Sequence, residues 1–275
     1  MRSIWLIAKS VLIEAVRRKE IYVIVLMAVG VILMTGTVKF FGYEGMNKFY
    51  RDVSLKIMNI TAALTVVVLA ARQLPREFEK RTIYPLLAKP VGRSTFLAGK
   101  FLGVVLAGAF CYALFVILFL GGMKFLGATL NWGLFTQTVF LQMLALCVVA
   151  AMAFMLSLLF NVDAAITVTV LVFALGGALS AAIDYIYDSM RTVIPFTAPW
   201  IDGHWYATSL GDVFMRFLNL AVPQLTLFDL SGKLIHENVW GPVPTWVILQ
   251  LTLYAGVYLL LFLGVSQILF SRRAL

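Results

Sequence analysis

Residues 101–123 read FLGVVLAGAFCYALFVILFLGGM and contain no charged side chain. An α-helix needs about 20 apolar residues to cross the roughly 30 Å hydrocarbon core of a bilayer, so this run predicts a transmembrane helix. Residues 134–160 form a second run of the same kind. Further apolar runs lie at about 21–38, 53–71, 164–183 and 246–270. The sequence therefore predicts an all-α polytopic membrane protein with six transmembrane helices.

The composition of the whole chain excludes a soluble enzyme. Of its 275 residues, 62% are hydrophobic and only 13% are charged, and the mean hydropathy is +0.95. Ordinary globular domains carry about twice that share of charged residues. The two cysteines, Cys111 and Cys147, lie inside apolar runs, so we expect core residues rather than a disulfide scaffold.

The distribution of basic residues predicts the orientation in the membrane. The N-terminal segment has five Lys and Arg residues, the connection at 72–100 has seven and the C-terminal tail has two, against eight on the opposite side. Cytoplasmic loops carry such an excess, so both termini and the 72–100 segment are expected in the cytoplasm. This bias accounts for the whole net charge of +9, and no nucleic-acid partner is expected.

Residues 1–20 are predicted to form an amphipathic helix that lies in the cytoplasmic interface, in contact with membrane lipid. Four consecutive charged residues at 17–20 make burial of this segment in the hydrocarbon costly. An N-terminal extension of the first span is the alternative. The apolar positions recur at three- and four-residue spacing and are Ile4, Ala8, Val11, Leu12, Ala15 and Val16.

The outer connection at 184–244 is too long for a simple turn, and loops of that length are usually functional or locally structured. Ser209 is a candidate cap for a short helix that ends before Pro223 and dips into the outer leaflet. An ordinary surface loop is the alternative, and an accessory protein on the outer side is a further candidate partner. His204 and His236 also lie here, but two histidines without a nearby Cys or Met pair make a poor copper site, so no metal is expected. Any other role of these histidines stays open.

The cytoplasmic segment 72–100 alternates dense charge with apolar side chains such as Phe78 and Ile83. Pro85 and Pro90 break any long helix, so short helical pieces parallel to the membrane are expected. Helical pieces of this kind bind a partner protein and pass its movement on to the adjoining transmembrane helices. The alternative is a solvated loop whose charges only set the topology.

Part of this segment, EKRTIYPLLAKPVGR at 79–93 with GK at 99–100, resembles the cytoplasmic signature of ABC-2 type transporter permeases. The family pattern is an acidic residue, Thr, a Leu-Leu-Ala-x-Pro block, Arg, and a Gly-Lys pair that opens the third span. The matching residues are Glu79, Thr82, Leu86, Leu87, Ala88, Pro90, Arg93, Gly99 and Lys100. Arg81 stands where many members carry Gly. In this the chain is similar to the branch named for multicopper-enzyme maturation, which is related to the permease of the nitrous-oxide reductase maturation system.

The resemblance implies a fold and a function for the whole chain. The fold is that of ABC-2 permeases, similar to type V exporters, with residues 1–275 as a single transmembrane domain in a bacterial or archaeal cytoplasmic membrane. The function is that of the membrane subunit of an ATP-binding-cassette (ABC) transporter. Two copies of a separate ATPase would bind ATP and Mg and drive export, and a second permease copy or a paralogue would complete the pathway. This chain itself would bind no cofactor.

The same resemblance makes the 72–100 segment the coupling element against the ATPase. The candidate contact residues are Arg76, Glu77, Glu79, Arg81, Thr82, Leu86, Leu87, Pro90 and Arg93.

The residues themselves argue against catalysis by this chain. The sequence has no G-x-x-x-x-G-K-[ST] phosphate loop, since the run from Gly92 to Lys100 has the wrong spacing and continues into Phe101. The G-x-S-x-G and H-E-x-x-H patterns are absent from the sequence as well. We therefore expect no catalytic residue here.

Glycines mark candidate packing or hinge positions. Gly99 and Gly103 form a G-x-x-x-G pattern at the start of the third span, which allows the close approach of another helix. Gly176 and Gly177 in the fifth span are either a flexible point or a packing contact.

Two other functional classes stay open beside the transporter subunit. Ion-coupled secondary transporters and channels usually carry mid-span charges and internal repeats, and neither is evident in this sequence. A permease-like assembly or maturation subunit would transmit force without moving a substrate. The substrate is open too: an apolar pathway suits lipids, drugs or hydrophobic peptides, whereas the branch resemblance suggests delivery of a cofactor or sulfur compound.

Overall fold

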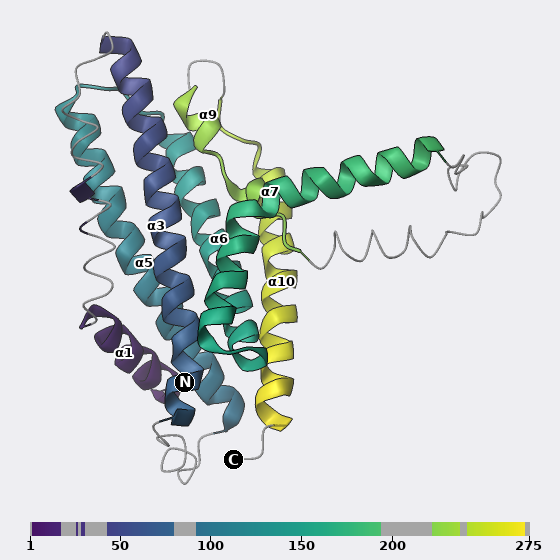
Figure 1. Cartoon of the computed structure of the whole chain (residues 1–275). Helices are drawn as coiled ribbons and strands as arrows, with labels where there is room; N and C mark the ends of the chain where they lie inside the picture. The colour runs from purple at the N-terminus through teal and green to yellow at the C-terminus, as the bar shows by residue number, and fades with distance from the viewer. Residues whose placement is uncertain are drawn as a thin grey trace. The chain divides into compact units, whose positions relative to one another are not determined.

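Helices account for all the regular structure in the part of the chain that the structure describes (Figure 1). The computed structural model describes residues 2–17, 26, 29–30, 43–79, 92–193, 222–236 and 241–272. The elements are α1 (Arg2–Val16), α3 (Tyr43–Glu79), α5 (Arg93–Phe125), α6 (Trp132–Leu159), α7 (Val162–Val193), the 3-10 helix η1 (Leu225–Phe228), α9 (Ser231–Ile235) and α10 (Thr245–Arg272).

Four of these helices are long and apolar enough to cross a membrane. They are α3 over Asn47–Glu77, and α5, α6 and α10 over their full lengths. They cover the predicted spans 53–71, 101–123, 134–160 and 246–270. A shorter apolar helical stretch of α7, Val162–Ala178, lies where the fifth span is predicted. The predicted first span, 21–38, falls outside the described residues except at 26 and 29–30.

α10 has one face packed on protein and an opposite apolar face suited to contact with lipid. One face is buried against the protein through Tyr258 and Phe262. The other face leaves Leu249, Leu253 and Val257 exposed at four-residue spacing. A long apolar stripe of this kind is unfavourable in water and favourable against lipid chains.

Both helices that flank the 72–100 segment are longer than predicted. α3 continues through Pro75 to Glu79, and α5 already begins at Arg93. Pro75 removes one backbone donor near the end of α3, where the helix has little further to run. The two ends of the segment are therefore continuous with long helices rather than separate short pieces, and Pro85 and Pro90 lie outside the described residues.

Two short connections join α5, α6 and α7. In the first, Gly127 adopts a left-handed φ of 64°, and the Asn131 side chain accepts a hydrogen bond of 3.3 Å from the Leu134 amide to cap α6. In the second, only Phe160 and Asn161 separate α6 from α7. The break between the helices thus lies at Phe160 and Asn161, and α7 begins two residues before the fifth span predicted from residue 164.

The chain divides into two compact units. The first comprises Met1–Val170 and Phe228–Leu275, and the second comprises Leu171–Leu227. Within the first unit, α5 packs against α1 and α3, while α6 packs against α3 and α10. Most α6 side chains are buried, so α6 forms the centre of the core of this unit.

α7 extends to Val193 and so includes the first ten residues of the predicted outer connection. Two short helices, η1 and α9, lie later in that connection. At the start of α9, the Asp229 carboxylate accepts hydrogen bonds from the amide and the hydroxyl of Ser231. α9 packs against α3 and α6. The helix predicted after Ser209 and the residue His204 lie outside the described residues.

Gln137 fixes the entry of the chain into α10. Its Nε2 donates a hydrogen bond of 3.0 Å to the Val243 carbonyl, and its Oε1 accepts one of 2.8 Å from the Val243 amide. Val243 is buried, so these two bonds satisfy backbone groups that water does not reach.

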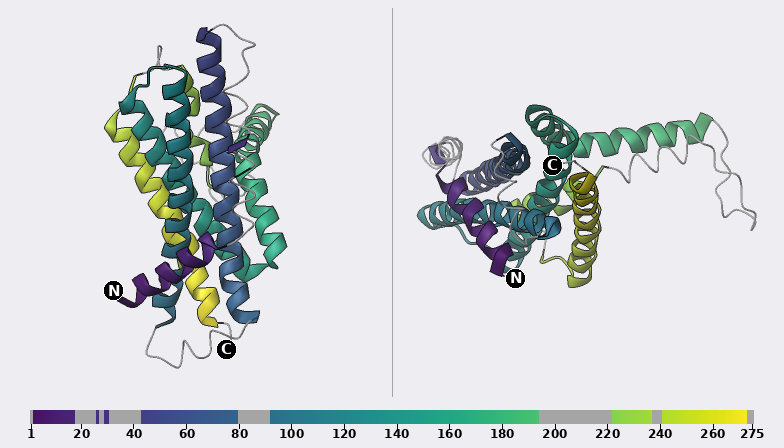
Figure 2. Two further views of the ribbon diagram at one scale, coloured as in Figure 1. Left: turned by 90° about the vertical axis from the view of Figure 1, so that its left-hand side faces the viewer. Right: turned by 90° about the horizontal axis from the view of Figure 1, so that it is seen from below.

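The helix α1 runs across the first turns of α5 instead of alongside it (Figure 2). The apolar stripe that predicted an amphipathic helix here is buried, with Ala8, Val11 and Ala15 all enclosed. This stripe faces α5, so the described structure uses it for protein packing.

Candidate functional site

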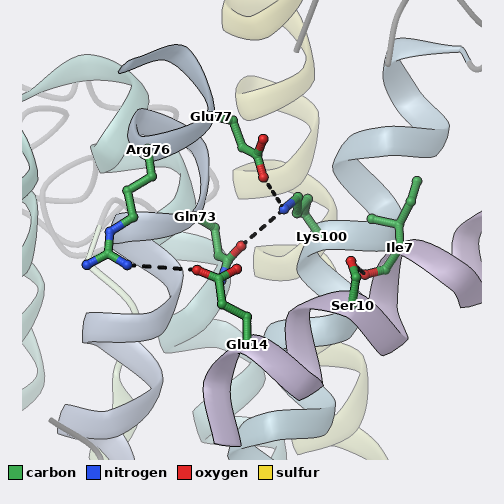
Figure 3. A network of polar contacts seen from close by, with 7 residues as sticks. All are labelled: Ile7, Ser10, Glu14, Gln73, Arg76, Glu77 and Lys100. Carbon is green, nitrogen blue, oxygen red and sulfur yellow. Dashed lines mark hydrogen bonds and ion pairs between the residues drawn. The ribbon is translucent and has the colours of Figure 1, made fainter. Parts of the chain in front are cut away.

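A buried ion pair joins the end of α3 to the start of α5, on either side of residues 80–92 (Figure 3). The Lys100 Nζ donates to Oε1 of Glu77 across 2.5 Å and lies 3.4 Å from Oε1 of Gln73. The Lys100 and Glu77 side chains are only 6% and 18% exposed. Removal of either partner would leave the other charge buried without compensation.

Local sequence explains why these groups meet. Gln73 and Glu77 lie one helical turn apart and therefore on the same face of α3. Lys100 is the last charged residue before the apolar run that starts at Phe101. Its ammonium also lies 5.7 Å from the centre of the Phe96 ring, one turn earlier on α5, a favourable cation–π distance.

A second ion pair connects α3 to α1. The Arg76 Nη1 lies 3.8 Å from Oε1 of Glu14, and both side chains are partly exposed (Figure 3). Solvent screens such a pair, so it contributes little energy on its own. We call Glu14, Gln73, Arg76, Glu77 and Lys100 the Lys100 cluster.

Two glycines of α5 bring α1 into backbone contact. A Cβ atom at Gly99 would lie 2.9 Å from Cβ of Ile7, and one at Gly103 would lie 2.6 Å from Cβ of Val11. Side chains at these positions would push α1 away. The helix that approaches this G-x-x-x-G pattern is thus α1.

The end of α10 reaches the same region. The Arg93 Nη1 donates a hydrogen bond of 2.8 Å to the Ser271 carbonyl, and the Phe96 and Phe270 rings stack with their centres 6.0 Å apart. Four elements, α1, α3, α5 and α10, therefore meet at one end of the first unit.

The described structure brings three of the predicted coupling residues into internal contacts, namely Arg76, Glu77 and Arg93. Glu79 is the last residue of α3. The remaining candidates lie outside the described residues and are Arg81, Thr82, Leu86, Leu87 and Pro90.

Sequence reasoning missed three members of the Lys100 cluster. Lys100 matches the family pattern, but neither it nor Gln73 nor Glu14 was predicted as a site residue. The position of Lys100 beside the apolar run and the spacing of Gln73 and Glu77 are the signals that point to them.

The glycine pair of the fifth span has two different surroundings. A Cβ at Gly176 would meet nothing within 4 Å, whereas one at Gly177 would lie 2.7 Å from Cγ2 of Thr226. Gly177 thus has a close neighbour within the second unit.

The described ranges contain no group of three or more His, Cys, Asp or Glu side chains that could hold a metal ion. His236 is exposed at the end of α9. Cys111 and Cys147 are free thiols inside α5 and α6.

Comparison with known protein families identifies a membrane transport protein. The family model described as ABC-2 family transporter protein matches residues 5–275, which includes all four membrane-length helices and the whole Lys100 cluster. No curated protein matches the chain. Because the family match extends over almost the entire sequence, this multi-pass membrane protein belongs to the ABC-2 family of transporter proteins.

Proposed function

We propose that this chain is the membrane subunit of an ABC exporter that is driven by a separate ATPase. The observation that carries the proposal is the family match over residues 5–275, in a chain whose 80–92 connection is flanked by the buried Glu77–Lys100 ion pair. Two ATPase copies would bind ATP and Mg, and a second permease copy or a paralogue would complete the transporter. The subunit proposed here holds no catalytic site of its own.

The proposed topology is a single transmembrane domain over 1–275, with six spans in a bacterial or archaeal cytoplasmic membrane. α1 would lie in the cytoplasmic interface, and both termini would be cytoplasmic. The basic residues around 2–19, 72–100 and 272–273 support this side assignment. It is also supported by the meeting of α1, the end of α3 and the end of α10 at one end of the first unit.

The proposed ATPase contact lies on the 79–93 part of the coupling segment. Arg76 and Glu77 are paired with Glu14 and Lys100, so they would act behind the contact. The buried Glu77–Lys100 pair would hold α3 to α5 there. Pressure on the segment would then move α3 and α5 as one body, because the Glu77–Lys100 pair locks their ends. α10 would follow through the hydrogen bond from Arg93 to Ser271.

The test is purification of the tagged chain with its neighbours from native membranes, followed by identification of co-purifying protein and an ATPase assay. The coupling variant is Glu79→Lys, which reverses a charge on the proposed contact. The matched control is Asp163→Lys, an exposed acid at the start of α7 that the proposed topology also places on the cytoplasmic side.

A stoichiometric ATPase that is retained by the unchanged chain and by Asp163→Lys, and lost from Glu79→Lys, supports the proposal. A chain that purifies alone and supports an ion-driven flux after reconstitution would instead identify a secondary transporter or channel. An ATPase that is retained while no substrate moves would favour a maturation subunit.

A further inference from the structure

The face of α1 that is turned away from α5 is both apolar and basic. Trp5, Leu6 and Ile13 are 58%, 65% and 43% exposed, and Lys9 and Arg17 are exposed as well. At about 100° per residue, these five positions fall within one third of the helix circumference. They lie opposite the buried stripe that packs on α5.

This face carries positive charge without negative charge among the described residues. The acid of α1, Glu14, is directed toward Arg76 of α3 and lies 3.8 Å from it. The charged groups of α3 and α5 next to α1 are paired with each other at Lys100 and Glu77. Lys9 and Arg17 are therefore left to attract an anionic partner.

The position of α1 along α5 indicates where this face lies. α1 packs on Gly99 and Gly103, which bracket Lys100, the last charge before the apolar run of 101–123. α1 runs across α5 at this point instead of alongside it (Figure 2). In the proposed topology this is the level at which the hydrocarbon core begins. A surface at this level meets lipid headgroups.

We propose that this face of α1 binds anionic phospholipid headgroups. Trp5, Leu6 and Ile13 would enter the outer part of the acyl layer, which suits an aromatic residue at the interface. Lys9 and Arg17 would reach the phosphates. Each basic residue near an anionic membrane surface raises the binding constant by about fivefold. The inference rests on the proposed function, which already places α1 in the cytoplasmic interface, and deepens it by naming the class of lipid that α1 binds.

The test measures contact between Trp5 and lipid in the full chain reconstituted into nanodiscs. The Trp5 fluorescence is obtained by subtracting the signal of a Trp5→Phe variant. Brominated phosphatidylglycerol and brominated phosphatidylcholine are then compared as quenchers at equal mole fraction. We expect the anionic lipid to quench more strongly, and the Lys9→Gln/Arg17→Gln variant to abolish the difference while quenching by phosphatidylcholine persists.

Lys124→Gln is the control, because Lys124 is exposed near the far end of α5. This variant should leave the preference unchanged. High salt should reduce the preference in the unchanged chain, because salt screens exposed charges. Equal quenching by the two lipids would overturn the inference, and so would an absence of quenching, which would mean that protein covers this face. The measurement needs neither ATP nor an ATPase, so its failure is distinct from failure of the proposed function.

Discussion

The Lys100 ammonium and the Glu77 carboxylate lie 2.5 Å apart, and this contact closes the chain between α3 and α5 into a loop. Both side chains are largely withdrawn from solvent. The loop it closes contains the segment proposed to meet the ATPase. The pair is therefore expected to affect both the stability of the protein and its proposed coupling to the ATPase.

Removal of one charge of this pair should destabilise the protein strongly. Glu77→Gln leaves the Lys100 charge buried and is expected to cost about 3–5 kcal/mol. The matched control is Asp52→Asn, which breaks an exposed ion pair of 2.8 Å with Lys56 and should cost under about 1 kcal/mol. Thermal unfolding of the detergent-purified variants measures both, and equal losses would contradict the buried pair. The double exchange Glu77→Lys/Lys100→Glu should recover part of the loss.

Filling the contact between α1 and α5 should also be costly. Gly103→Ala places a Cβ against Val11 and the Ala8 carbonyl, for which overpacking costs about 1–3 kcal/mol. Gly121→Ala is the control on the same helix, because a Cβ there meets nothing within 4 Å. That control should stabilise α5 by up to about 1 kcal/mol through helix propensity. Melting temperatures that move in the same direction would argue against close packing of α1.

Loss of the Gln137 side-chain amide should loosen the entry into α10. Gln137→Leu removes both hydrogen bonds to Val243 and leaves its backbone groups unsatisfied, at about 1–3 kcal/mol each. Hydrogen exchange of the Val243 amide should then accelerate by roughly tenfold or more. Thr136→Val serves as the control, since the Thr136 hydroxyl bonds to Gly133 instead. Unchanged exchange in Gln137→Leu would show that the bonds do not protect this amide.

A charge on the exposed stripe of α10 should impair membrane insertion. Val257 lies near the middle of this helix, where an aspartate costs about 2.5–3.5 kcal/mol on insertion scales. Phe125→Asp is the comparison, because Phe125 is exposed at the very end of α5, where water is near. Resistance to alkaline extraction should fall for Val257→Asp alone. If Val257→Asp is inserted normally, that face does not meet lipid.

The sequence was sufficient to predict the membrane-length helices because their signal is local. An uncharged run such as 101–123 is stable in a bilayer only as a transmembrane helix. The described helices overlap four of the predicted spans. The family resemblance also rested on local residues around 79–100, and the family match confirms it. Helix ends were harder to predict, because α3 continues beyond the apolar run through the polar residues 72–79, where hydropathy no longer marks the helix.

The contacts within the Lys100 cluster could not be predicted, because they depend on how separate helices face one another. Lys100 and Glu77 are joined by a connection whose path the sequence leaves open, and Glu14 comes from a third helix. The role of α1 was hidden for a different reason. Both its faces carry apolar residues, and the regular stripe at Ala8, Val11 and Ala15 turned out to pack on protein.

The two faces of α1 have a consequence for the order in which the protein is made. A ribosome completes α1 long before it reaches Gly99 and Gly103, so the newly made helix has no α5 to pack on. If its second face binds the membrane surface, the newly made helix keeps part of its apolar surface out of water and is less prone to aggregate. Its docking on α5 would then follow once that helix has entered the bilayer.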